Sequence, residues 1–321
     1  MAEQDAIKQF ADFAFPYAND RFAEVAAKGL KMAHYTTAEA AALILGNQSL
    51  WLRNAALMND FSEVAYGNAC LEQSFSSGLG ARLQAAIDVV HPGLFRNVTE
   101  RINNVDVHTR THTYLTSLSA HNQESQLGRL SMWRAYGGPT SGVAIIFNTE
   151  VFAHDSDRLG AYSSPVLYGG VTEFSRELVR VIENIENNRH VLAQVPFDNA
   201  ASILFNSLQF STLSTKHPAF EEEQEWRVIH HPLSEPSAFI STCTRTIRGI
   251  PQMICEVPLR DQVGLNMPWL DLNRLLSHVI IGPCVYPKQV AWAFREILRE
   301  IGIANPDSRI AIANIPLRQN G

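Results

Sequence analysis

The segment that most constrains the fold is GVAIIF at residues 142–147, six residues without a charged or hydrogen-bonding side chain. Strands with one solvated face alternate polar and apolar residues, whereas a continuous apolar run is typical of a strand that is covered on both faces. We therefore expect a central sheet with helices packed against it.

Short strands and irregular helices surround this run without a fixed repeat. We expect strands at residues 31–35, 50–52, 112–119, 225–230, 279–281 and 309–313, and a strand or hairpin at 247–257. Helices are expected at residues 36–45, 62–90 with a break near 78–80, 126–136, 171–192, 198–214 and 287–301. This order differs from a regular βαβ repeat, so we predict an α+β fold whose central sheet is mixed, mostly antiparallel and flanked by helices.

The N-terminal residues predict two amphipathic helices. Ile7 and Phe10 are spaced for one helical face, and Phe22 and Val25 for the next, with Pro16 between the two helices. We predict a helical N-terminal extension at residues 1–30 and a single α+β domain of catalytic type at residues 31–321.

The composition excludes several classes of protein. Of the 321 residues, 46% are hydrophobic and 18% are charged, which is typical of a globular protein. The 26 Lys and Arg against 32 Asp and Glu give a net charge of −6, so no basic surplus is available for non-specific binding of a nucleic-acid backbone. No apolar run approaches about 18 residues and no secretory signal pattern is present, so we expect a cytoplasmic protein without membrane spans.

The common catalytic motifs are absent from the sequence. It contains no Walker A loop, dinucleotide-binding glycine motif, H-E-x-x-H or G-x-S-x-G. The cysteines at positions 70, 243, 255 and 284 show no C-x-x-C spacing, so we expect reduced thiols and no metal site.

Two clusters lie at predicted strand ends near the N-terminal half. In the first, His34, Tyr35 and Thr36 lead from a strand into a helix, where a histidine can bind a ribose hydroxyl or a phosphate. A backbone-satisfied histidine followed by a helix cap is the alternative. In the second, Asn59 and Asp60 follow the next strand, and a turn with a capping aspartate is the favoured interpretation.

A third cluster combines hydroxyl and aromatic side chains. Ser117 and Ser119 fall on one face of a predicted strand, and Trp133 and Tyr136 on one face of a predicted helix. The aromatic pair is expected to belong to the core, and a wall for stacking a flat ring is the alternative.

The fourth cluster is the acidic run at residues 221–225, which precedes a predicted strand. Glu223 and Glu225 are expected on one side of the start of the strand, with Arg227 continuing that face. Crowded carboxylates require a cation or a ligand. A solvated acidic turn in which Arg227 is the counter-ion is the alternative. The alternation also predicts that Trp226 is buried.

In this order the clusters resemble a bacterial domain-of-unknown-function family across residues 31–318. The matching motifs are HYT at 34–36, LWL at 50–52, NDFSE at 59–63, SLS at 117–119, MWRAY at 132–136, GVAIIF at 142–147, EQEWR at 223–227 and VIIGP at 279–283. Ser62 departs from a spacing that commonly contains proline, and the acidic lead-in Glu221–Glu222 is unusually long.

The strand with His34, the middle strand with Ser117 and Ser119, and the late E-x-E strand also resemble the layout of NAD-using ADP-ribosyltransferases. That resemblance implies NAD as the substrate and no metal, with Glu225 as the catalytic carboxylate and Glu223 orienting the acceptor. It also implies that the NAD-binding residues are His34, Tyr35, Thr36, Ser117, Ser119, Trp133, Tyr136 and Arg227.

The resemblance implies an ADP-ribosyltransferase or NAD glycohydrolase, acting as a toxin or phage-defence effector on a protein or nucleic-acid acceptor. It requires Glu225 and His34 to lie on adjacent strands and to open into one pocket. Two alternatives stay open: a binding or regulatory module that has lost the chemistry, and a metal-dependent nuclease that uses the acids at 221–225 with Asp60. The oligomeric state and the acceptor cannot be derived from the sequence.

Overall fold

The computed structural model describes residues 2–57, 61–104, 112–122, 125–138, 141–153, 158–233, 235–247 and 249–315. Contacts divide the chain into two compact units, each built from three segments. Unit 1 comprises Met1–Ala23, Ala55–His112 and Ser164–Glu222, and unit 2 comprises Glu24–Asn54, Thr113–Ser163 and Glu223–Gly321. The predicted extension at 1–30 and single domain at 31–321 stay predictions, because compactness does not show which parts fold alone.

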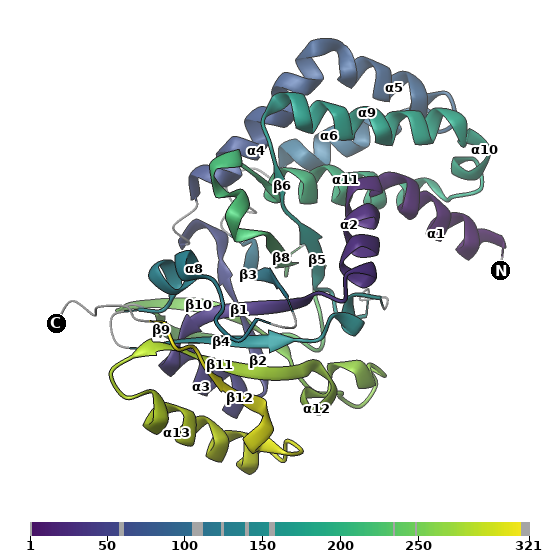
Figure 1. The fold of residues 1–321 in the computed structure, drawn as a ribbon. Coiled ribbons are helices and arrows are strands. Elements are labelled where there is room, and N and C mark those ends of the chain that lie inside the picture. The colour runs from purple at the N-terminus through teal and green to yellow at the C-terminus, as the bar shows by residue number, and fades with distance from the viewer. Residues whose placement is uncertain are drawn as a thin grey trace. The chain divides into compact units, whose positions relative to one another are not determined.

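Unit 1 is helical (Figure 1). Its helices are α1 (Ala2–Ala14), the first part of α2 (Pro16–Ala27), α4 (Phe61–Ser74), α5 (Gly80–Asp88), α6 (Leu94–Asn104), α9 (Val171–Asn187), α10 (Arg189–Leu192) and α11 (Phe197–Leu213). The short parallel strands β6 (Leu167–Tyr168) and β7 (Thr215–Lys216) accompany them. In α9 the buried residues Phe174, Leu178, Val181 and Ile185 recur every three or four positions, so one side of the helix packs into the hydrophobic core of the unit.

The helix breaks have local causes. The π-helical turn Phe75–Leu79 separates α4 from α5, and Gly78 there has a positive φ of 102°, which confirms the break predicted near residues 78–80. The single helix predicted at residues 171–192 is divided instead at Asn188, whose backbone leaves the helical region.

Unit 2 contains the central sheet. Its strands are β1 (Lys31–Thr37), β2 (Ser49–Asn54), β3 (Tyr114–His121), β4 (Ser141–Phe147), β8 (Glu225–His230), β9 (Ser241–Ile247), β10 (Ile250–Pro258), β11 (Leu276–Cys284) and β12 (Ile310–Ile312); β5 (Tyr162–Pro165) lies at a boundary between segments of the two units. Its helices are α3 (Ala38–Gly46), α8 (Leu130–Tyr136), α12 (Leu272–Leu275) and α13 (Pro287–Glu300). Every pairing among the strands of unit 2 described below is antiparallel, except that of β11 with β12.

The sheet forks along one edge of β3. Strand β8 pairs with Tyr114–Ser119 along the edge of β3 that is not forked. On the forked edge, β1 pairs with residues 119–121 and β2 with residues 114–115. The limb β1-β4-β11-β12 and the limb β2-β10-β9 therefore leave β3 at different points, and residues 116–118 lie at the fork.

Helices cover the faces of the first limb. Helices α3 and α13 pack together on one face (Figure 1), and α8 packs on the other, where Met132 and Trp133 contact Tyr35 and Ile146. The Trp133 ring requires glycine beneath it: a Cβ at Gly282 would lie 2.7 Å from its Cε3 atom. Glycine is therefore required at position 282 of this strand, because the Trp133 indole ring occupies the space that a side chain would fill.

The structure confirms a mixed α/β fold with a largely antiparallel central sheet flanked by helices. The helix predicted from residue 126 begins only at Leu130, because Gly128 has a positive φ of 68°. Thr37 caps α3, and its hydroxyl accepts a hydrogen bond from the Ala40 amide at 3.2 Å. Within the described residues, no helix is both long and apolar enough to cross a membrane.

Candidate functional site

The candidate site is built on one face of β3 and β8. Ser119 pairs with Glu225 and Ser117 with Arg227 across the two strands. Directly opposite residues in an antiparallel pair point to the same face, so these four side chains share one face of the sheet. Trp226 alternates to the other face and is 1% exposed, which confirms its predicted burial.

Glu225 is a buried carboxylate with two kinds of donor. Its Oε1 atom accepts hydrogen bonds from the Ser117 hydroxyl at 2.5 Å and from Arg227 Nε at 2.9 Å. Glu225 is 4% exposed and Arg227 is 3% exposed. The alternative of a solvated acidic turn with Arg227 as counter-ion is correct for the exposed Glu221 and Glu222 and for the pairing of Arg227. The Glu225–Arg227 ion pair itself is not a surface contact: it is buried, and the burial of each charge depends on the other.

Arg129, which the sequence patterns did not single out, joins β3 to the segment before β8. Its guanidinium donates to the Ser119 hydroxyl at 2.9 Å, to the carbonyls of Glu223 and Ala120 at 2.8 and 2.7 Å, and to Gln224 Oε1 at 2.6 Å. The Ser119 hydroxyl also donates to the Glu223 carbonyl. One arginine therefore fixes the chain where it enters the Glu225 strand.

The acidic run is not part of the strand. Residues Pro218–Glu223 form a 3-10 helix, and Gln224 has a positive φ of 43°. Glu221 and Glu222 are exposed. The two-residue alternation begins only at Glu225, so the argument that placed Glu223 and Glu225 on one side does not apply. The acceptor-orienting role of Glu223 stays a prediction.

His34 does not lie on a strand adjacent to that of Glu225, because β3 separates β1 from β8. The prediction of adjacent strands is therefore wrong. Ala33 pairs with Ser119, so His34 alternates to the opposite face from Ser119 and Glu225. The expectation that the two side chains open from one face into a shared pocket is also wrong.

The His34 ring reaches the fork of the sheet. Its Nδ1 atom lies 3.2 Å from the Ser117 carbonyl, to which it donates a hydrogen bond where β1 no longer pairs with β3. Burial lowers the pKa of His34 and this carbonyl raises it, with burial the larger effect. The ring is therefore neutral at pH 7 and carries its proton on Nδ1. Ser117 thus links the two predicted residues, through its carbonyl to His34 and through its hydroxyl to Glu225.

The aromatic residues divide between core and margin. Trp133 is 4% exposed, donates from Nε1 to the Leu127 carbonyl at 2.8 Å and meets Tyr35 edge to face at 4.9 Å. This burial favours the core interpretation of Trp133. The Tyr35 hydroxyl accepts from the Arg129 amide at 2.9 Å, and burial raises the pKa of Tyr35. Tyr136 is half-buried beside this cluster.

Three further residues named from the sequence are Thr36, Asn59 and Asp60. Thr36 is half-buried and pairs with Val143, so its NAD-binding role stays a prediction. Asn59 and Asp60 lie outside the described residues. Among the residues that the structure describes, no three His, Cys, Asp or Glu side chains are grouped to hold a metal ion.

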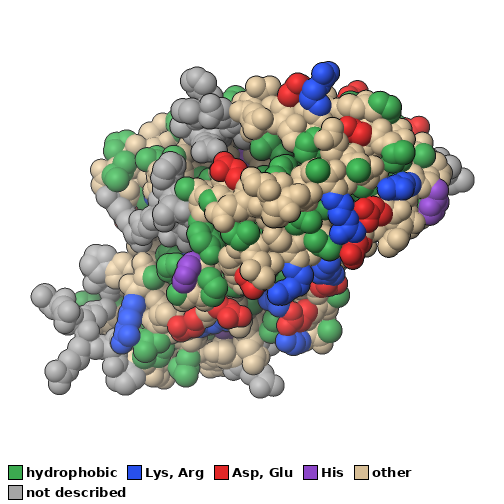
Figure 2. Space-filling view, turned by 90° about the horizontal axis from the view of Figure 1, so that it is seen from above, with side chains coloured by type: hydrophobic (Ala, Val, Ile, Leu, Met, Phe, Trp, Pro, Cys, Tyr) green, Lys and Arg blue, Asp and Glu red, His purple; other side chains and the backbone are tan. Residues whose placement is uncertain are grey.

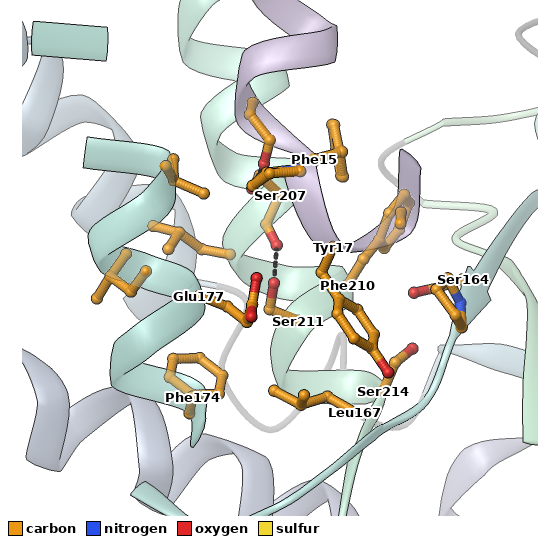
Figure 3. A pocket seen from close by; sticks show the side chains of 17 residues that line it. Phe15, Tyr17, Ser164, Leu167, Phe174, Glu177, Ser207, Phe210, Ser211 and Ser214 are labelled. Atoms are coloured by element: carbon orange, nitrogen blue, oxygen red, sulfur yellow. Dashed lines mark hydrogen bonds between the residues drawn. The ribbon is translucent and has the colours of Figure 1, made fainter. Parts of the chain in front are cut away.

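A pocket lies within unit 1, apart from every predicted site residue. Its lining includes Phe15, Tyr17, Phe174 and Phe210, with Glu177 (Figure 3). Arg180 donates to Glu177 at 2.7 Å, so this carboxylate already has a cationic partner. Such a lining suits a small apolar or aromatic group, and the sequence patterns gave no indication of it.

Surface charges are mixed. On the face drawn in Figure 2, basic and acidic side chains are interspersed. Among the described side chains drawn there, no single sign of charge dominates.

Comparison with known proteins gives one family. The family described as "Protein of unknown function (DUF2971)" matches residues 132–228, which is less than half of the chain. The match includes the MWRAY and EQEWR motifs, whereas His34, Ser117 and Ser119 lie outside it. No curated protein and no solved structure matches the chain. The chain is thus similar, over this central region, to a family whose function is unknown.

Proposed function

We propose that unit 2 cleaves the nicotinamide–ribose bond of NAD, as an ADP-ribosyltransferase or NAD glycohydrolase, with Glu225 as the catalytic carboxylate. The observation that carries the proposal is the buried Glu225 carboxylate, held in one orientation by Ser117 and Arg227. A buried carboxylate with a specific charged partner is the kind of group that active sites use.

In the proposed reaction, the bond from ribose C1′ to the nicotinamide nitrogen breaks and its electron pair leaves with neutral nicotinamide. The ribose becomes oxocarbenium-like, and a preorganised carboxylate stabilises this positive charge. An acceptor hydroxyl or water then forms the new bond to C1′ and releases its proton. NAD supplies the reactive bond.

The geometry changes the role that we propose for His34. The resemblance required His34 and Glu225 to open into one pocket, and the structure does not meet that requirement, so the proposal rests on the buried Glu225 carboxylate and not on the resemblance. Because the His34 side chain is on the other face, we assign it as a positioning residue that holds the Ser117 carbonyl, while the Ser117 hydroxyl orients Glu225. Ser119 and Arg129 hold the neighbouring segment in the same way. A cytoplasmic location, a toxin or phage-defence role and a macromolecular acceptor belong to this proposal.

A second candidate function is a binding or regulatory module without chemistry. The observation in its favour is that Glu225 is 4% exposed and already accepts from Ser117 and Arg227, as a structural ion pair would. The nuclease alternative has no comparable support within the described residues, because Glu225 is engaged with Arg227 rather than with other carboxylates.

The test is nicotinamide release from NAD by the purified protein, alone and with cell lysate as a source of acceptor. Wild-type protein is expected to release nicotinamide, and Ser117→Ala, which removes a donor without unbalancing a charge, is expected to lower kcat. Thr116→Ala on the same strand is the matched control. A folded wild-type protein that releases no nicotinamide in either condition would overturn the proposal and favour the binding module.

A further inference from the structure

A cluster of basic side chains lies at one end of the sheet of unit 2, on the same face as Ser119. Lys31 on β1 pairs with His121 on β3, two residues beyond Ser119. The ring centroids of His121 and His278 are 6.0 Å apart, and His278 lies on β11. Arg309 directly precedes β12, which pairs with β11. Four residues from distant parts of the sequence therefore converge.

Backbone and hydroxyl groups hold these side chains in place. Lys31 Nζ donates to the Ser277 hydroxyl at 2.6 Å, and the Ser277 oxygen lies 3.0 Å from His278 Nδ1. The Arg309 guanidinium donates to the carbonyls of Leu276 and Ser277 at 2.5 and 2.9 Å. The positive groups are thus assembled by neutral acceptors.

One polar atom of the cluster has no partner. His121 is 3% exposed, and its buried Nε2 atom has no hydrogen-bond partner among the described residues. Buried polar atoms are rarely left unpaired, and such an atom is normally satisfied by a water molecule, an ion or a ligand. Lys31, Ser277, His278 and Arg309 are half-buried, so the cluster is reachable from solvent.

The charges acting within the cluster are all positive. Burial, followed by the charges of His121, Lys31 and Arg309, lowers the pKa of His278 to about 4. Burial and the Arg309 charge lower the pKa of Lys31. Burial and the charges of Arg129 and Lys31 lower the pKa of His121, and a hydrogen bond with the backbone of Ser125 partly offsets this lowering. Assembling cations in this way is unfavourable in the absence of an anion, and an anion would relieve the repulsion.

We propose that Lys31, His121, Ser277, His278 and Arg309 form a binding site for a phosphate or diphosphate group. The site would provide a lysine ammonium, an arginine guanidinium, a hydroxyl and two imidazoles, which are the donors that proteins use for phosphate oxygens. This proposal does not depend on Glu225 chemistry, because none of these five residues contacts Glu225 in the hydrogen bonds described above.

The site predicts how affinity varies with pH. An imidazole that is neutral in the free protein binds a proton more readily beside a bound dianion, so its pKa rises on binding. Binding of the dianionic form is therefore coupled to proton uptake by the imidazoles, and affinity for that form is expected to increase as the pH falls from 7.5 towards 6.

The experiment is calorimetric titration of the whole protein with inorganic diphosphate, and separately with inorganic phosphate. We expect binding that Lys31→Met or Arg309→Met weakens about tenfold or more, since hydrogen bonds to charged groups contribute on that scale. Lys28→Met and Arg299→Met are matched controls, because these side chains pair with Glu24 and Glu296 instead. The control variants should bind as the wild type does.

Two results would overturn the proposal: no binding of either anion at millimolar concentration by folded protein, or equal binding by wild type and by the Lys31 and Arg309 variants. A competition arm identifies the source of the group. Displacement of diphosphate by NAD assigns the site to a dinucleotide, and lack of displacement assigns it to a separate small phosphate ligand. Ser117→Ala should retain diphosphate binding even if it releases no nicotinamide, so the two proposals fail separately.

Discussion

Neutralising Glu225 tests both the buried ion pair and the proposed chemistry. From the sequence alone, Glu225→Gln is expected to abolish NAD cleavage and to leave stability unchanged or slightly raised, because it relieves a crowded acidic run. The structure reverses the second expectation. Arg227 is 3% exposed and bonded to Glu225 at 2.9 Å, so the variant removes the carboxylate charge that this buried guanidinium faces.

The expected cost follows from this burial. Removing one partner of a buried ion pair typically costs about 3–5 kcal/mol, and Gln retains an acceptor oxygen, so we expect about 3 kcal/mol. Replacing both charges in Glu225→Gln/Arg227→Gln should recover most of the loss, because neutral pairs at buried sites are often as stable as the ion pair. Nicotinamide release should stay absent in both variants.

Urea denaturation followed by tryptophan fluorescence is the appropriate assay. All five tryptophans, at positions 51, 133, 226, 269 and 292, belong to unit 2, so their emission reports the unit that contains the pair. A Glu225→Gln variant as stable as the wild type would refute the buried-pair argument. A double variant that is stable and still releases nicotinamide would remove Glu225 from the proposed mechanism.

Three further predictions concern packing and pH. Gly282→Ala should destabilise unit 2 by about 1–3 kcal/mol, because the added Cβ would lie 2.7 Å from the Trp133 ring. The same fluorescence assay measures this loss, and unchanged stability would contradict the packing of Trp133 on Gly282. Ser207→Ala should lower the stability of unit 1 by about 1 kcal/mol, because the Ser207 hydroxyl donates a hydrogen bond to the Ala14 carbonyl at 2.5 Å. Urea denaturation followed by far-UV circular dichroism measures this loss, and unchanged stability would show that the hydrogen bond does not hold α1. The pKa of His278 is lowered in the folded protein to about 4 from an ordinary 6.5, so its contribution to stability is present above about pH 6.5 and is lost as the pH falls towards 4. A His278→Gln variant should therefore lose less stability than the wild type over that range, and an equal loss would contradict the assignment.

Local patterns predicted the elements well where a single segment carries its own signal. The strand expected at residues 225–230 is β8 (Glu225–His230), and the strand or hairpin expected at residues 247–257 corresponds to β10 (Ile250–Pro258), which pairs with β9 (Ser241–Ile247), a strand that was not predicted. Backbone conformations that only a few residues adopt were harder to predict. Gly128 delays the start of α8, and Gln224 interrupts the alternation before Glu225.

The site was only partly predictable, because strand pairing is non-local. The sequence indicated Ser117 and Glu225, but nothing local states that β3 lies between β1 and β8. Arg129 and the basic cluster were missed for the same reason: Lys31 and Arg309 are almost a chain length apart. A search for basic residues at the ends of predicted strands could have identified the cluster, since sheet formation brings such ends together.

The register also relates the two proposed sites to each other. His121 and Ser119 are two residues apart on β3 and point to the same face, so the basic cluster begins about 7 Å along the strand from the Ser119–Glu225 pair. A ligand that carries a diphosphate joined to a ribose could lie along this face with its phosphates at Lys31 and its ribose near Glu225. This arrangement predicts that Lys31→Met raises the KM for NAD and leaves kcat nearly unchanged, because the lysine would bind substrate and transition state equally. Ser117→Ala should do the opposite and lower kcat. If both variants change only kcat, or if Lys31→Met leaves KM unaltered, the diphosphate of NAD does not occupy the basic cluster, and the two sites serve different ligands.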